Sequence, residues 1–173
     1  MCIYVTVFGG GHKDTSTKEY KDSIVIGNIL ASNQFIVKNG GYYGIMEAVS
    51  KGASEMNGYV IGHTCNSFKY KSGNKYLSET NPGENIYHRL QLLIENTDIF
   101  IFQKGGIGTL SELFLTLDIV RKLDKKPTII LFGEFWKDVI NSVSHLFNEG
   151  EGEIFKIVSS IDEIKILLDN EKI

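Results

Sequence analysis

The segment Gly105-Gly106-Ile107-Gly108-Thr109 combines the residue types that bind an anion through the protein backbone. Its glycines let the backbone approach a ligand closely, and the run lies between an apolar stretch and a strongly helical one. The amide hydrogens of such a loop and the positive end of a helix dipole suit a phosphate or another anion. We expect Thr109 to be the N-cap of the helix, with its hydroxyl within reach of a phosphate oxygen. A tight strand-to-helix turn with an ordinary cap is the alternative interpretation.

Glu112 and Arg89 are the charged residues that we expect next to this loop. Glu112 lies one turn into the helix on a largely apolar face, which predicts a carboxylate that is either salt-bridged or functional. A glutamate that only complements the helix dipole is the alternative. Arg89 lies at the edge of the apolar stripe of the preceding helix, and its guanidinium suits bidentate contact with a carboxylate or phosphate. By residue type alone, a surface arginine is the more common case.

The helix predicted over residues 109–123 is apolar on two sides, which predicts that both sides are covered. One stripe consists of Leu110, Leu113, Phe114, Leu117 and Val120, and the other of Leu115, Ile119 and Leu123 beside Glu112. We expect the first stripe to pack on a sheet. The second needs a partner, so the pattern predicts a homodimer through helix 109–123.

Short apolar runs alternate with helical segments along the chain. The runs cover residues 3–8, 35–38, 59–62, 99–102, 128–132 and 154–158, and the helical segments 17–31, 44–56, 84–96, 109–123, 136–148 and a last one from 161. This pattern predicts an α/β fold with a doubly wound parallel sheet of about six or seven strands and helices on both faces. With the strand order 3-2-1-4-5-6, the glycine-rich ends of strands one, two and four converge on one crevice. The long polar stretch 63–82 is expected to be functional or mobile.

Composition narrows the classes of function. The chain has 173 residues, 42% of them hydrophobic, which suits a single domain over residues 1–173. A net charge of −3 gives no basic footprint for polymeric nucleic acid, and no apolar stretch is long enough for a membrane span. Cys2 and Cys65 are expected to be free thiols in the cytoplasm. His63 and Cys65 form at most an incomplete metal pair, so we expect neither a metal nor a cofactor.

At this point the motifs resemble those of a known family. The stretch Lys104-Gly105-Gly106-Ile107-Gly108-Thr109-Leu110-Ser111-Glu112, preceded by Arg89, resembles the signature Pro-Gly-Gly-x-Gly-Thr-x-x-Glu of the "lonely guy" (LOG) family, formerly labelled lysine decarboxylases. The segment Gly40-Gly41-Tyr42-Tyr43-Gly44-Ile45-Met46 is similar to its Gly-Gly-x-x-Gly-x-Met motif, and Val7-Phe8-Gly9-Gly10 also fits.

The resemblance implies a Rossmann-like fold, a dimer and an enzyme. Many members of the family are phosphoribohydrolases that cleave the N-glycosidic bond of cytokinin riboside 5′-monophosphates or AMP, releasing the base and ribose 5-phosphate. The family's catalytic arginine and glutamate fall on Arg89 and Glu112. Its phosphate-binding loop falls on residues 105–109, and Gly10, Gly41 and Met46 are implied to bind the substrate. The expected partner is therefore a small-molecule nucleotide.

The sequence also departs from the family pattern. Lys104 replaces the proline before the double glycine, which adds a cation near the expected phosphate, and Leu90 replaces a basic residue. Relatives of the family include molybdenum-cofactor carriers and nucleotide-sensing domains. Arg89 and Glu112 favour an enzyme, whereas Lys104 and Leu90 favour a non-catalytic carrier or sensor of a nucleotide or the molybdenum cofactor.

Overall fold

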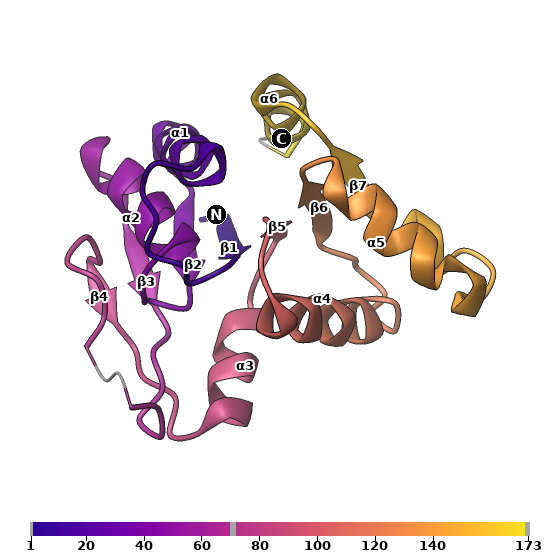
Figure 1. The fold of residues 1–173 in the computed structure, drawn as a ribbon, viewed down its shortest axis with the longest axis horizontal. Coiled ribbons are helices and arrows are strands. Elements are labelled where there is room, and N and C mark those ends of the chain that lie inside the picture. Colours follow the sequence, from indigo (N-terminus) through magenta and orange to yellow (C-terminus); the bar gives the residue numbers. More distant parts are fainter. Residues whose placement is uncertain (1, 70–71, 172–173) are drawn as a thin grey trace.

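A computed structural model describes residues 2–69 and 72–171, and its strands form one parallel sheet (Figure 1). The seven strands described there are β1 (Tyr4–Phe8), β2 (Ile36–Asn39), β3 (Val60–Gly62), β4 (Glu79–Thr80), β5 (Ile99–Phe102), β6 (Thr128–Phe132) and β7 (Phe155–Val158). They lie in the order β4-β3-β2-β1-β5-β6-β7. The predicted strand order is confirmed, with β4 added at the edge beside β3.

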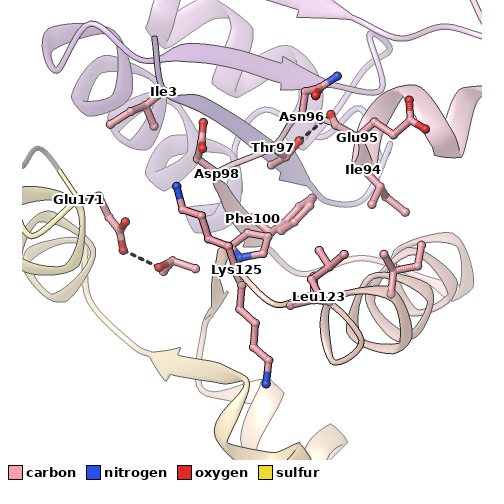
Figure 2. A pocket seen from close by; sticks show the side chains of 15 residues that line it. Ile3, Ile94, Glu95, Asn96, Thr97, Asp98, Phe100, Leu123, Lys125 and Glu171 are labelled. Atoms are coloured by element: carbon pink, nitrogen blue, oxygen red, sulfur yellow. Dashed lines mark hydrogen bonds between the residues drawn. The ribbon is translucent and has the colours of Figure 1, made fainter. Parts of the chain in front are cut away.

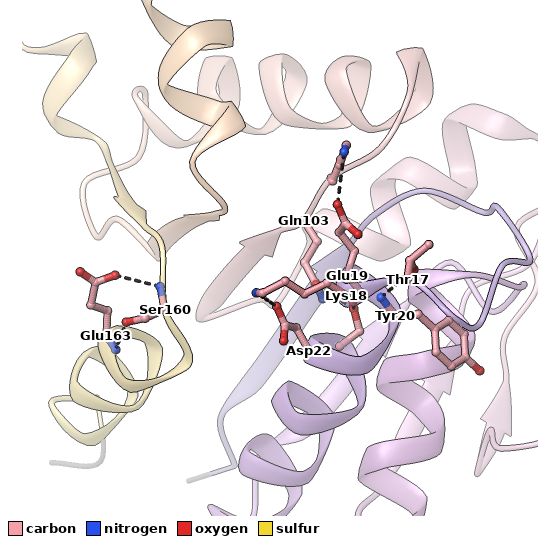
Figure 3. Close-up of polar contacts among 10 residues, drawn as sticks. Thr17, Lys18, Glu19, Tyr20, Asp22, Gln103, Ser160 and Glu163 are labelled. Carbon is pink, nitrogen blue, oxygen red and sulfur yellow. Dashed lines mark hydrogen bonds and ion pairs between the residues drawn. The ribbon is translucent and has the colours of Figure 1, made fainter.

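In the described residues, a helix follows each strand except β3. The helices are α1 (Lys18–Ser32), α2 (Ile45–Glu55), α3 (Ile86–Ile94), α4 (Ile107–Val120), α5 (Phe135–Val143) and α6 (Ile161–Asp169), with short 3-10 turns η1 (Ser144–Leu146) and η2 (Glu151–Glu153). Side-chain caps begin three of them. Asn85 accepts from the amides of Tyr87 and His88 at α3. Thr17 accepts from the amide of Tyr20 at α1, and Ser160 forms a capping box with Glu163 at α6 (Figure 3).

The sheet is buried on both faces because successive side chains of a strand point to opposite sides. In β5, Ile99 and Ile101 pack in the core beneath α1, α2 and α6, whereas Phe100 and Phe102 pack in the core that α3, α4 and α5 cover (Figure 1). The predicted doubly wound, Rossmann-like α/β architecture is thereby confirmed.

Several predicted boundaries of helices are wrong. Helix α4 begins at Ile107 with Gly106 as its N-cap, so Thr109 lies inside the first turn and is not the cap. The helix ends at Val120, and α5 ends at Val143, where η1 takes over. Glycines have low helix propensity, which made residues 106–108 look like loop in the sequence.

The apolar stripe that α4 packs on the sheet also differs in one member. Phe114 is 37% exposed, and Thr116 is fully buried in its stead. The hydroxyl of Thr116 donates to the carbonyl oxygen of Glu112 at 2.7 Å, so its burial leaves no unpaired polar group. The rest of this stripe packs largely as predicted, since Leu113, Leu117 and Val120 are buried.

In the part of the chain that the structure describes, no helix is both long and apolar enough to cross a membrane.

Candidate functional site

A cavity of about 180 Å³ lies where β1, β2 and β5 end, at the carboxyl edge of the sheet. Of the residues selected from the sequence, seven line it: Gly10, Met46, Arg89, Gly106, Gly108, Thr109 and Glu112. Gly105, Ile107 and Gly41 do not. Gly105 lines the adjoining cavity, the side chain of Ile107 is 87% exposed, and Gly41 is buried against Gly62 and Thr64. Gly40 lines the cavity where Gly41 was expected.

The loop before α4 is held against the loop after β1 by backbone contacts. The amide of Gly10 donates to the carbonyl oxygen of Lys104 at 3.0 Å. A Cβ atom at Gly105 would lie 2.1 Å from Thr109 Oγ1 and 2.9 Å from the nitrogen of Gly10, so this approach requires glycine. At Gly106 and Gly108 a Cβ atom would meet no described atom within 4 Å. These two glycines therefore present bare backbone to open space.

The N-terminus of α4 suits an anion. Among the described residues, no side chain caps this end of the helix. The first amides of an α-helix have no partner within the helix, and they carry the positive end of its dipole. Backbone amides of residues 107–109 are thus available beside the cavity, which is the arrangement that binds phosphate groups in many proteins.

Arg89 and Glu112 form a buried ion pair across the cavity. Nη1 of Arg89 donates to Oε1 of Glu112 at 3.4 Å, and the side chains are only 7% and 14% exposed. Burial raises the pKa of Glu112 above its ordinary value, although the opposite charge of Arg89 acts against this shift. A largely desolvated carboxylate with a raised pKa, next to a fixed cation, is typical of catalytic acids and bases.

Arg89 donates to backbone carbonyl oxygens of the residues that directly follow β2 and β3. Nε donates to the carbonyl oxygen of His63 at 2.7 Å, and Nη2 donates to that of Gly40 at 3.4 Å. A Cβ atom at Gly40 would lie 2.0 Å from Nη2, so any side chain there would displace the guanidinium. The signal for Gly40 was present in the sequence, since it is the first glycine of the motif over residues 40–46 and follows a predicted strand.

His63 contributes its backbone to the site and keeps its ring buried. Its Nδ1 lies 3.3 Å from the carbonyl oxygen of Asn81. Burial, with the nearby charge of Lys38, lowers the pKa of His63 to about 4, so the ring is neutral at neutral pH. The structure places no cluster of three His, Cys, Asp or Glu side chains suited to a metal within the described residues.

Lys104, which was expected to add a cation near the phosphate, is paired with a carboxylate. Its ammonium lies 3.2 Å from Oε1 of Glu19 in α1, an exposed ion pair. Both residues line an adjoining cavity of about 470 Å³. Gly10, Gly11 and Gly106 line this cavity and the smaller one alike. The two cavities therefore lie on either side of the same loops.

A larger cavity of about 660 Å³ opens at the other edge of the sheet, near the starts of β5 and β6 (Figure 2). Two of its polar side chains have partners in the protein: Asp98 accepts from the amide of Tyr4 at 2.9 Å, and Thr128 donates to Glu171. None of the catalytic or binding residues expected from the sequence lines it. Its size alone does not make it the candidate site.

Comparison with known families tests the resemblance to the LOG family that the motifs indicated. The sequence model of the SLOG cluster4 family matches residues 2–157. The chain belongs to this family. The family is LOG-like, which confirms the resemblance at the level of the superfamily.

Individual relatives of this SLOG protein are distant. A protein of Archaeoglobus fulgidus without an assigned function is 26% identical over 138 residues, covering 76% of this chain and 85% of the relative. The molybdenum cofactor binding protein of Rippkaea orientalis superposes with a TM-score of 0.80 at 20% identity, covering 98% and 97% of the two chains. The molybdenum cofactor carrier protein of Chlamydomonas reinhardtii gives 0.75 at 17% identity, covering 98% of each. At such identities the two structures show a shared fold.

Proposed function

We propose that this SLOG protein is a nucleoside 5′-monophosphate phosphoribohydrolase, which hydrolyses the N-glycosidic bond to give the free base and ribose 5-phosphate. The observation that carries the proposal is the buried pair of Arg89 and Glu112 on the cavity beneath the glycine loops. A protein that only binds a phosphate needs the loop but has no use for a buried carboxylate with a raised pKa.

The chemistry requires a carboxylate near the anomeric carbon. As the ribosyl C–N bond breaks, its electron pair leaves with the base and positive charge develops on the sugar. The carboxylate of Glu112 stabilises this charge and accepts the proton of the attacking water, whose oxygen forms the new bond to the anomeric carbon. Because its pKa is raised, the carboxylate is a stronger proton acceptor than an exposed glutamate.

Arg89 and the loop before α4 have binding roles in this proposal. Arg89 cannot act as a general acid, because a guanidinium keeps its proton at any pH of interest. It orients Glu112 and offsets negative charge in the transition state. The amides of residues 107–109 hold the 5′-phosphate and thereby position the reacting bond. The cavity of about 180 Å³ has room for the sugar, and the adjoining cavity offers space for the base.

A carrier of a nucleotide or of the molybdenum cofactor is the second candidate function. It is favoured by the overall likeness to two proteins whose names state that they bind or carry this cofactor. Such a carrier would use the same loops and cavities. It would differ from the enzyme in leaving its ligand unchanged.

Incubation of the purified protein with a panel of nucleoside 5′-monophosphates, followed by chromatography for free base and ribose 5-phosphate, separates these functions. We expect release from at least one monophosphate and none from the matching nucleosides. Calorimetry should show that AMP binds more tightly than adenosine, because the α4 amides need an anion. Tight binding without release would favour the carrier. Equal affinity for AMP and adenosine would contradict the phosphate site.

The proposal includes a homodimer through α4. Leu115 and Ile119 are only half-buried in the single chain, and Leu123, the third residue of the predicted stripe, is 43% exposed. Sedimentation should therefore give twice the chain mass of 19.4 kDa. Placing a charge in this face with Ile119→Glu should give monomers, because a buried charge without a partner is costly. A clean monomer of the unaltered protein at micromolar concentration would contradict this use of the helix.

A further inference from the structure

Two aromatic side chains, those of Tyr42 and Phe68, flank Arg89, and both come from loops at the carboxyl edge of the sheet. We propose that Tyr42 and Phe68 are positioning residues, which hold the guanidinium of Arg89 in place against the carboxylate of Glu112. This inference rests on the proposed function, since the pair they position is the proposed catalytic pair. Neither ring lines the cavity of about 180 Å³, so neither is proposed to touch the substrate.

The geometry is that of a cation beside two rings. The guanidinium carbon of Arg89 lies 5.8 Å from the ring centroid of Tyr42 and 5.7 Å from that of Phe68. The two centroids are 6.0 Å apart, with the rings stacked at 30°. The three groups thus form a nearly equilateral triangle at cation–π distances. Such contacts stabilise the observed side-chain conformation of Arg89 relative to other rotamers.

The rings are themselves held by the backbone. The hydroxyl oxygen of Tyr42 accepts from the amide of Cys65 at 2.8 Å and donates to its carbonyl oxygen at 3.5 Å. The amide of Phe68 donates to that same carbonyl oxygen at 3.2 Å. The loop after β2 and the loop after β3 are therefore joined at the backbone of Cys65. The ring positions follow from this junction, and Arg89 packs against both.

A second set of hydrogen bonds joins the loop of Tyr42 to Asn74, which lies farther along the polar stretch 63–82. Nδ2 of Asn74, whose side chain is buried, donates to the carbonyl oxygen of Tyr42 at 2.9 Å. The amide of Asn74 donates to the carbonyl oxygen of Gly41 at 2.7 Å. The stretch 63–82 was expected to be functional or mobile. These contacts give its described part a positioning role.

Hydrogen bonds alone leave Arg89 under-restrained. Its bond to His63 is short, but those to Gly40 and Glu112 are both 3.4 Å long. Rotation about the end of the side chain would weaken both long bonds at once. Contacts with the two rings oppose that rotation. Removing a ring should therefore loosen Arg89 from Glu112 while leaving the fold of the sheet unchanged.

The test compares Phe68→Leu with Phe147→Leu, a matched control. Phe147 is also partly buried and contacts one aromatic ring, that of Phe155, far from the site in sequence and outside both site cavities. The carboxyl carbon of Glu112 is titrated by ¹³C NMR. Arg89 is the charged group that acts against the raised pKa of Glu112. We expect the midpoint to move upward in Phe68→Leu, to stay in Phe147→Leu, and to return in Phe68→Tyr, which restores a ring.

Turnover provides the second measurement. In Phe68→Leu, kcat should fall about tenfold, since small displacements of catalytic groups have effects of this order or larger. Tyr42→Phe keeps the ring and removes only the hydroxyl, so it should shift the Glu112 midpoint in the same direction by less. This variant tests the inference even if Phe68→Leu does not fold.

The NMR titration needs no turnover, so it separates this inference from the proposed function. If the unaltered protein shows no turnover but the Glu112 midpoint rises in Phe68→Leu, the positioning role is supported and the proposed enzymatic function is contradicted. A Glu112 midpoint that is the same in Phe68→Leu, Tyr42→Phe and Phe147→Leu would overturn the inference.

Discussion

Two cations are buried on the same side of the sheet, Arg89 in α3 and Lys38 in β2, and they have different surroundings. The ammonium of Lys38 donates to the carbonyl oxygen of Glu95 at 2.7 Å and to Oγ1 of Thr97 at 3.0 Å. These acceptors lie just past the C-terminus of α3, where a cation complements the helix dipole. Lys38 lines none of the three cavities described above, whereas Arg89 has a carboxylate partner and open space before it.

The comparison teaches that a buried charge does not by itself indicate a functional site. Lys38 bonds to a backbone carbonyl and a hydroxyl beneath a helix end, and that arrangement serves the fold. Arg89 also donates to two backbone carbonyl oxygens, but its charged partner is a desolvated carboxylate at a cavity of bare backbone. Chemistry is expected where a fixed cation, a carboxylate and space coincide.

The largest effect is expected from Arg89→Ala. Removing one member of a buried ion pair leaves the other without compensation, so AMP affinity should fall at least tenfold and turnover at least about a hundredfold. Calorimetry and base-release assays on protein shown to be folded by circular dichroism would check this. If Arg89 served only the fold, as Lys38 does, the folded variant would bind and turn over AMP normally.

A smaller loss is expected from Arg89→Lys. The charge is kept, but an ammonium lacks the planar fork that reaches His63, Gly40 and Glu112 at once. Turnover should fall about tenfold, between the unaltered protein and Arg89→Ala. Steady-state kinetics of the three proteins side by side would show the order. Turnover equal to that of the unaltered protein would mean that only the charge of Arg89 matters.

The smallest effect on activity is expected from Lys38→Met. This substitution should instead change how the folding stability depends on pH. Burial lowers the pKa of Lys38 to about 8 from its ordinary 10.5. The unfolded chain therefore binds more protons than the folded protein between these two pH values, and folding stability gains from Lys38 as pH rises through that window. Urea unfolding at pH 7.5 and pH 10.5 should show this gain in the unaltered protein and its absence in Lys38→Met. Equal pH dependence would contradict the buried position of Lys38.

Much of the fold was predictable because its strands are continuous apolar runs. Residues 99–102 and 128–132 were predicted with the bounds that β5 and β6 have. Strand β4 could not be predicted, since Glu79–Thr80 is polar, exposed and only two residues long, and exists through its pairing with Ile61 and Gly62. Local sequence carries no signal for such an edge strand.

The site was predictable where it follows the topology. The convergence of the glycine loops and the pairing of Arg89 with Glu112 both follow from the order of the strands. The contacts of Phe68 and the burial of Lys38 could not be inferred, because each depends on partners distant in sequence. The predicted start of α4 was wrong because the N-terminus of this helix lacks the side-chain cap by which helix starts are recognised in a sequence.

The central claim is that Glu112 performs the chemistry, and Glu112→Gln tests it most directly. Glutamine keeps the volume and can still accept a hydrogen bond from Arg89, so AMP affinity in calorimetry should stay within about twofold, while release of ribose 5-phosphate falls at least about a hundredfold. If Glu112 only complemented the dipole of α4, the variant would lose at most about 1 kcal/mol of stability and remain active. A folded Glu112→Gln protein that releases base at the rate of the unaltered enzyme would contradict the account.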